Sequence, residues 1–163
     1  MGYVSAVLAT ITGYSVGLFV HILAVVLAFG PTFGYALFFS VAPQSPRATP
    51  ALLAGIQKTD RFLVNPGLIV VLLAGIYLLS EGNISAGESW VSIGFLAILA
   101  LFGLQHGFFR PQVRTAKALA ERDLQSGDTL SEEFTGLSQR IGRVGTLTGM
   151  IVVIAIFFMT VKP

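Results

Sequence analysis

Residues 13–42 read GYSVGLFVHILAVVLAFGPTFGYALFFSVA and contain no Asp, Glu, Lys or Arg. They belong to an apolar segment between Val4 and Ala42, and no charged side chain occurs before Arg47. At a rise of about 1.5 Å per residue, about 20 apolar residues cross about 30 Å of hydrocarbon. The segment therefore predicts a membrane-spanning helix, and its Gly30-Pro31 pair predicts a kink or a tilt.

The remainder of the chain has the same character. Hydrophobic residues make up 54% of the 163 residues and charged residues only 11%, whereas soluble domains carry about 25% charged residues. This composition excludes a water-soluble enzyme, a nucleic-acid-binding protein and a disordered tail, so the lipid bilayer is the expected partner and nucleic acid is not. The absence of cysteine also excludes disulfides, thiolate metal sites and thiol nucleophiles.

Three further apolar segments are long enough to cross a membrane. We place the four spans at about residues 13–42, 62–80, 90–109 and 144–161. Apolar positions also recur at helical spacing after the third span, at Val113, Ala116, Ala120 and Leu124. We therefore expect one all-α domain over residues 1–163, an integral-membrane four-helix bundle in which a polar helical extension connects spans three and four.

The basic residues predict the orientation of these spans. Nine of the ten Lys and Arg residues fall between spans one and two or between spans three and four, whereas the connection from Ser80 to Ser89 carries only Glu81 and Glu88. By the positive-inside rule, the two basic connections are cytoplasmic and both termini are extracytoplasmic. The prediction is a multi-pass membrane protein.

His21 is the ionisable side chain placed well inside a span. It belongs to a face of small and polar residues that we expect to point into the bundle. The face consists of Tyr14, Gly17, His21, Ala24, Ala28, Thr32 and Tyr35. An intramembrane ionisable group is a functional-site hypothesis by default. Two interpretations stay open, a neutral imidazole hydrogen-bonded to a neighbouring helix and a ligand or proton-transfer group.

His106 lies near the cytoplasmic end of span three, with Arg110 one turn later. It is either an ordinary interface histidine, or a second haem ligand or a contact for a porphyrin carboxylate; Arg110 would pair with propionates. The simplest arrangement of spans places His21 and His106 at depths that differ by roughly 25 Å. Pairing of the two imidazoles on one iron is therefore possible but not favoured.

Two further features have structural interpretations. Asp60 and Arg61 are expected to form a solvated pair at the headgroups. Gly145 and Gly149, with Gly142 one turn earlier, form a small-residue face that predicts close helix packing in span four. Three methionines and two histidines at different depths make a poor soft-metal site, so we expect no copper or zinc site.

Several stretches together resemble a known superfamily. The run from His21 to Gly30 resembles a histidine-to-glycine motif in its first span, and the stretch from Lys58 to Leu79 is similar to its second span. Trp90 with Gln105-His106-Gly107 resembles the third, and the ending Val161-Lys162-Pro163 is similar to its closing residues. The superfamily contains bacterial four-helix protoporphyrinogen oxidase and copper-resistance-protein-D-like proteins. The closest likeness is to a branch of predicted four-span integral membrane proteins.

The resemblance implies a bacterial cytoplasmic (inner) membrane as the location and haem b as cofactor, with His21 as an iron ligand. It also implies a third-span lysine that is important for the oxidase activity, but Gly94 occupies that position here and residues 90–109 contain no lysine. Whether the protein is an enzyme therefore stays open. The leading hypothesis is a haem-binding or redox-linked membrane protein. The alternative is a non-catalytic accessory or assembly subunit of a larger, respiratory-type membrane complex. Besides the bilayer, the expected partner is a second copy of the chain or such a complex.

Overall fold

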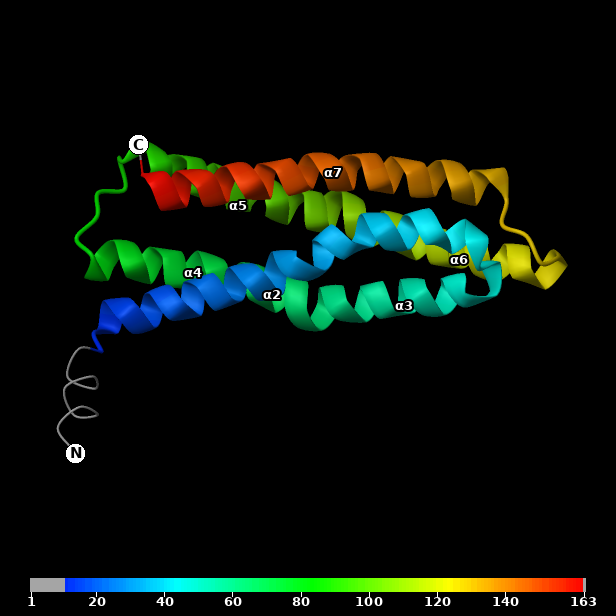
Figure 1. Ribbon diagram of the computed structural model, residues 1–163, viewed down its shortest axis with the longest axis horizontal. Helices are drawn as coiled ribbons and strands as arrows, with labels where there is room; N and C mark the ends of the chain where they lie inside the picture. Colours follow the sequence, from blue (N-terminus) through cyan, green and yellow to red (C-terminus); the bar gives the residue numbers. More distant parts are fainter. Residues whose placement is uncertain (1–10, 163) are drawn as a thin grey trace, which may run out of the picture.

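The computed structural model describes residues 11–162, and this part of the chain is all-helical. Figure 1 shows long helices lying side by side along one axis. Four continuous helical stretches are long and apolar enough to cross a membrane. The helices and short helical turns are α2 (Gly13–Val41), η1 (Ala42–Gln44), η2 (Pro46–Ala48), α3 (Thr49–Thr59), η3 (Asp60–Val64), α4 (Asn65–Glu81), α5 (Ser89–Leu104), η4 (Gln105–Phe109), α6 (Arg110–Ser126) and α7 (Glu132–Val161).

These helices confirm the four predicted spans and lengthen three of them. The second span is part of a helical stretch that begins at Pro46, the third continues to Ser126, and the fourth begins at Glu132. The expected polar continuation of the third span is present as α6. Residues 4–10 of the first apolar segment lie outside the described residues.

Helix α2 begins at a capped first turn and continues past an internal proline. Thr12 caps the first turn, because its hydroxyl accepts from the backbone N–H of Ser15 at 3.2 Å and Ser15 Oγ accepts from the Thr12 N–H at 2.9 Å. Pro31 lies inside the helix, which continues past it to Val41. The predicted inward face is confirmed, because all seven of its residues are buried or half-buried.

Helices α2 and α4 approach each other closely at Gly67 and Ala28. A Cβ added at Gly67 would lie 2.9 Å from the Ala28 Cβ and 3.1 Å from the Ala28 backbone. Small side chains on both sides therefore allow the two backbones to meet, which is how helices associate in lipid. The surrounding core includes Ala24, Leu68 and Val71.

A second core lies at the far end, where the helices leave the apolar region. Helix α6 packs Val113, Ala116 and Ala120 against α3, α7 and the end of α2, around the fully buried Phe134. The stretch from Ser89 to Ser126 has 38 residues, or about 57 Å of helix, against about 30 Å of hydrocarbon. Part of it must therefore project beyond the hydrocarbon, and polar α6 is that part.

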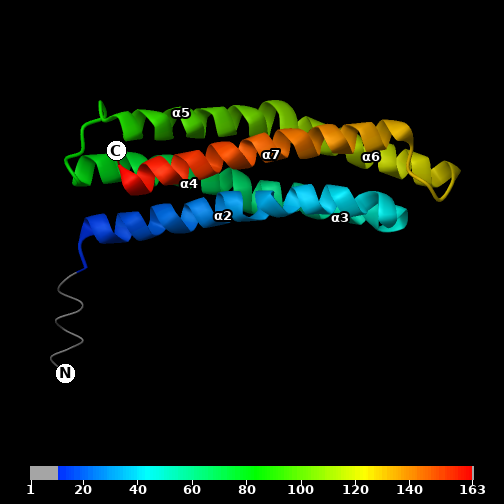
Figure 2. The same ribbon diagram turned by 45° about the horizontal axis from the view of Figure 1, so that its top comes forward.

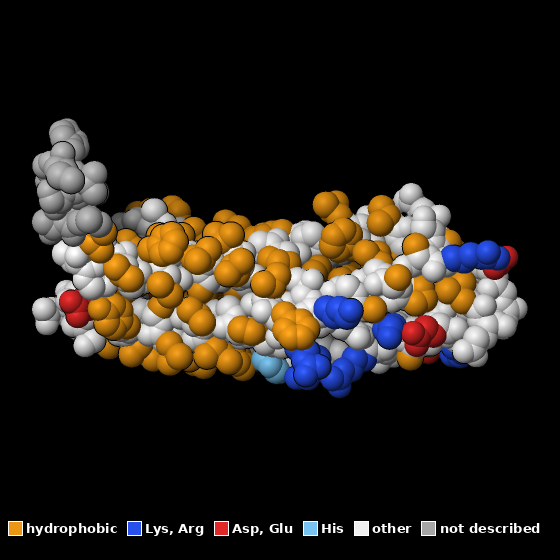
Figure 3. Space-filling model, turned by 90° about the horizontal axis from the view of Figure 1, so that it is seen from below, with side chains coloured by type: hydrophobic (Ala, Val, Ile, Leu, Met, Phe, Trp, Pro, Cys, Tyr) orange, Lys and Arg blue, Asp and Glu red, His pale blue; other side chains and the backbone are white. Residues whose placement is uncertain are grey.

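The distribution of charge follows the same division. In Figure 3, hydrophobic side chains cover one long part of the surface, and the Lys and Arg side chains gather toward the other end. Helix α2 begins and α7 ends at one end of the molecule, whereas the connections 42–48 and 127–131 lie at the opposite end (Figures 1 and 2). The two basic connections therefore share one side, as the sequence predicts.

Candidate functional site

Two cavities lie between the helices, one in each half of the bundle. The outer cavity, near the beginning of α2 and the end of α7, has a volume of about 480 Å³ and is lined by His21, Gly75, Gly94 and Lys162 among mostly apolar residues. The inner cavity has a volume of about 510 Å³ and is lined by Tyr35, Gln105 and the glycines of α7. Phe29 and Leu101 line both cavities.

His21 faces the outer cavity from α2. Its ring lies against α4, where a Cβ added at Gly75 would be 3.4 Å from the His21 Cε1. The ring also stands beside the Val71 backbone. Its Nδ1 is buried and makes no well-formed hydrogen bond to any of the described residues 11–162. Gly75 therefore leaves space for the imidazole. The imidazole in turn has one nitrogen, Nδ1, that lies among apolar residues without a well-formed hydrogen bond.

The other two predicted site residues are placed elsewhere. His106 is exposed on η4, its Nδ1 lies 3.1 Å from the Phe102 carbonyl oxygen, and its ring stacks on Phe102 with centroids 4.7 Å apart. Arg110 is exposed at the beginning of α6. Neither residue lines the two cavities. The structure thus does not bring His106 or Arg110 together with His21.

Lys162 is the cation that does reach the outer cavity. Its Nζ lies 5.1 Å from the centre of the Trp90 ring, and both residues line the cavity. Lys162 is not one of the candidate site residues that the sequence predicts. Its contribution to the cavity depends on α7 returning beside the beginning of α5, which no local sequence pattern indicates.

Gly94, at the position where the resemblance implies a lysine, is covered by a side chain from α7. A Cβ at this position would overlap the Met159 methyl group. A methionine end is flexible and can move away. In this protein the Met159 side chain nevertheless fills the space beside Gly94.

A buried polar cluster lies at the inner cavity. The Tyr35 hydroxyl donates to Asp60 Oδ1 at 2.8 Å, and the Gln105 amide and the Arg110 charge lie close enough to act on the same carboxylate. Asp60 and Gln105 are each only 6% exposed. The expectation that Asp60 and Arg61 form a solvated pair is therefore wrong. Arg61 instead lies 5.7 Å over the Phe62 ring.

Two π-helical segments place this cluster. Asp60 is the first residue of η3 and Gln105 is the first residue of η4. In both cases a proline follows six residues later, at Pro66 and at Pro111. A proline cannot donate to the preceding turn and crowds its carbonyl, and π segments frequently occur at functional sites. This repeated spacing is the sequence signal that could have identified the cluster.

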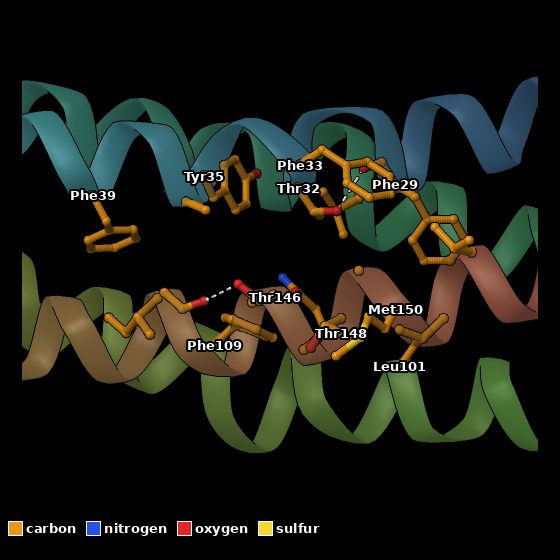
Figure 4. Close-up of a pocket in the computed structure, with 18 of the residues that line it drawn as sticks. Phe29, Thr32, Phe33, Tyr35, Phe39, Leu101, Phe109, Thr146, Thr148 and Met150 are labelled. Atoms are coloured by element: carbon orange, nitrogen blue, oxygen red, sulfur yellow. Dashed lines mark hydrogen bonds between the residues drawn. The ribbon is translucent and has the colours of Figure 1, made fainter.

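The glycine face of α7 opens onto the inner cavity instead of packing closely. A Cβ added at Gly142 or Gly145 would meet nothing within 4 Å, and one at Gly149 would meet only the Phe33 ring, at 3.4 Å. The prediction of close packing for Gly142 and Gly145 is therefore wrong within this chain. Figure 4 shows α2 side chains facing Thr146, Thr148 and Met150 of α7 across this space.

The sequence from residue 15 to residue 163 matches the model of a family described as "Predicted integral membrane protein (DUF2269)". The chain belongs to this family. The match covers all four helical stretches with the exception of the first two residues of α2. It agrees with four apolar helices and makes the protein an integral membrane protein that crosses the bilayer several times. No curated protein and no solved structure matches the sequence.

Proposed function

We propose that this protein is a redox-linked membrane protein that binds a haem b-type cofactor in the outer cavity through His21. The observation that carries the proposal is the buried, unpartnered Nδ1 of an imidazole that lines an apolar cavity. Leaving a buried polar atom without a partner costs about 1–3 kcal/mol, so such an atom needs an explanation. A ligand-binding role for the ring is one.

The residues of the outer cavity fit such a group. Its volume of about 480 Å³ is within the range of about 300–1,000 Å³ that small-molecule and cofactor sites occupy. Iron-binding histidines usually donate their second ring nitrogen to a backbone carbonyl or a carboxylate, and the Val71 backbone stands beside this ring. Lys162 supplies a positive charge for a propionate.

A bound haem supplies one-electron chemistry, and the residues of this chain determine its surroundings. His21 would hold the group through an imidazole nitrogen, Gly75 leaves space for the imidazole, and the apolar lining would exclude water. His106 and Arg110 have no part in the outer cavity. A role for either in cofactor binding requires a separate contact on the exposed face of η4 and α6.

The proposal includes the orientation predicted from the charges. Both basic connections would lie in the cytoplasm of a bacterium, with the outer cavity toward the opposite side of the inner membrane. The common placement of connections 42–48 and 127–131 at one end supports this orientation.

An optical spectrum of the detergent-purified protein tests the cofactor. We expect a Soret band, in the protein as purified or after haem addition, that His21→Ala removes or shifts. His106→Ala is the matched control, because it removes an imidazole that lies outside the cavity, and it should leave the band unchanged. A protein with no Soret band even after haem addition would overturn the proposal, and so would a His21→Ala variant with an unchanged spectrum.

Two observations favour the alternative, a non-catalytic accessory or assembly subunit of a larger membrane complex. Only 6% of the apolar window of α7 is buried within this chain, and the glycines at 142 and 145 are open. A helix of this kind offers a surface for foreign helices. Native mass spectrometry after gentle solubilisation tests this alternative: a protein found alone, as a monomer or a homodimer, argues against it.

A further inference from the structure

We propose that the inner cavity is a binding site for a lipid-soluble quinone, separate from the haem site. Three features of the cavity carry the inference: an unused hydrogen-bond donor, an acceptor beside it, and apolar walls widened by glycines. None of the three depends on His21 or on the outer cavity.

The donor is the side-chain amide of Gln105. It lines the cavity, it is 6% exposed, and its Nε2 makes no hydrogen bond of acceptable geometry. The nearby Asp60 carboxylate accepts from Tyr35 and lies close enough to act on one of the two amide N–H groups, which leaves the other for a ligand. An amide has two N–H groups, and a ligand oxygen in the cavity would satisfy one of them. The missing partner is therefore an acceptor such as a carbonyl.

The acceptor is the phenolic oxygen of Tyr35. Its own proton is donated to Asp60 Oδ1 at 2.8 Å, which leaves the oxygen lone pairs free to accept from a group in the cavity. The polar end of the cavity thus offers one donor and one acceptor. A quinone carbonyl accepts from Gln105, and the hydroxyl of the reduced quinol donates to Tyr35. Both redox forms of the same molecule find a partner.

The walls suit a flat ring with an apolar tail. The ring would lie among Phe29, Phe39 and Phe109, and the open Cβ positions of Gly142 and Gly145 leave space opposite α2 (Figure 4). Phe33, Val153 and Ile154 line the cavity and are also exposed on the apolar surface. A tail can therefore leave the cavity into lipid. A saturated acyl chain would fill the apolar part but would leave the Gln105 amide unpaired.

Binding of decylubiquinone to the full-length protein in detergent, measured by isothermal titration calorimetry, tests the site. We expect saturable binding, and none for decylbenzene, which has the same chain and no carbonyl. Gln105→Leu keeps the size of the side chain and removes the donor, so it should weaken binding about 10-fold or more. His21→Ala should bind decylubiquinone normally, which separates this inference from the haem proposal.

A pair of glycine variants tests the location. Gly145→Val places a side chain in open cavity space, so the protein should fold and lose most of its quinone binding. Gly103→Val is the matched control, because a Cβ there also meets nothing within 4 Å and Gly103 lines neither cavity. Equal binding of decylbenzene, absence of saturable binding, or full affinity in Gln105→Leu would overturn the inference. Full affinity in a folded Gly145→Val would overturn it as well.

Discussion

The Tyr35 hydroxyl and Asp60 Oδ1 are 2.8 Å apart, in a hydrogen bond that ties the middle of α2 to the π-helical segment η3. Asp60 is 6% exposed and lies within an apolar bundle. A buried carboxylate in such surroundings requires partners. Tyr35 is thus the group that makes an acidic residue tolerable at this position.

Replacing Tyr35 with Phe should destabilise the protein by about 1–2 kcal/mol, because the Asp60 oxygen loses its donor while the ring keeps its packing. Asp60→Asn should cost less, since its amide oxygen still accepts from the hydroxyl. Unfolding of the purified protein by SDS in mixed micelles measures both variants. A Tyr35→Phe protein as stable as the unmodified one would contradict the role of this hydrogen bond.

The sequence predicts much of this fold because the strongest signals are local. Apolar length identifies the four helices, and the three- and four-residue spacing of small residues from Gly17 to Thr32 identifies the inward face of α2. Positions Val113, Ala116 and Ala120 likewise predict the buried face of α6. Each pattern shows which face of one helix is buried. It can be detected from the helical spacing of residues within that helix alone.

The candidate sites depend on relations between helices, and these were harder to predict. Asp60 beside Arg61 has the appearance of a surface ion pair, but the π-helical turn of η3 directs Asp60 toward Tyr35 and Gln105. The glycines of α7 suggested close packing, although that pattern does not show whether a neighbour or a cavity lies opposite. Lys162 reaches Trp90 only because the end of α7 lies beside the beginning of α5.

The buried Gly67 should be far less tolerant of substitution than the glycines that are exposed or have open space beside them. Gly67→Ala brings a methyl group to 2.9 Å from the Ala28 Cβ and 3.1 Å from its backbone, and a backbone cannot swing aside as a side chain can. We expect a loss of about 1–3 kcal/mol in stability from overpacking. Thermal unfolding in detergent, followed by circular dichroism, measures the change.

Gly103→Ala is the control for this prediction. A Cβ at Gly103 meets nothing within 4 Å, and alanine favours a helix over glycine by about 1 kcal/mol. The variant should unfold at the same temperature as the unmodified protein or at a higher one. A Gly67→Ala protein as stable as Gly103→Ala would show that α2 and α4 are not held at the distance described.

The connection between α6 and α7 should weaken at low pH through Asp123, which lies in the polar extension outside the hydrocarbon. Hydrogen bonding by Ser131, from its hydroxyl and from its backbone N–H at 2.8 Å, lowers the pKa of Asp123, and Arg122 lowers it further. A carboxylate whose pKa is lower in the folded state stabilises that state fully above its unfolded pKa of about 3.9. The contribution is lost as the pH falls through the folded pKa.

Asp123→Asn should therefore unfold at a lower temperature than the unmodified protein at pH 7, and the difference should shrink as the pH is lowered below about 3.9. Arg47→Ala is a suitable control, because it breaks an ion pair with Asp128 whose side chains are 82% and 73% exposed, and such pairs contribute little. An Asp123→Asn difference that stays constant down to the lowest pH at which the protein is folded would contradict the assignment of Asp123 as the group that joins the two helices.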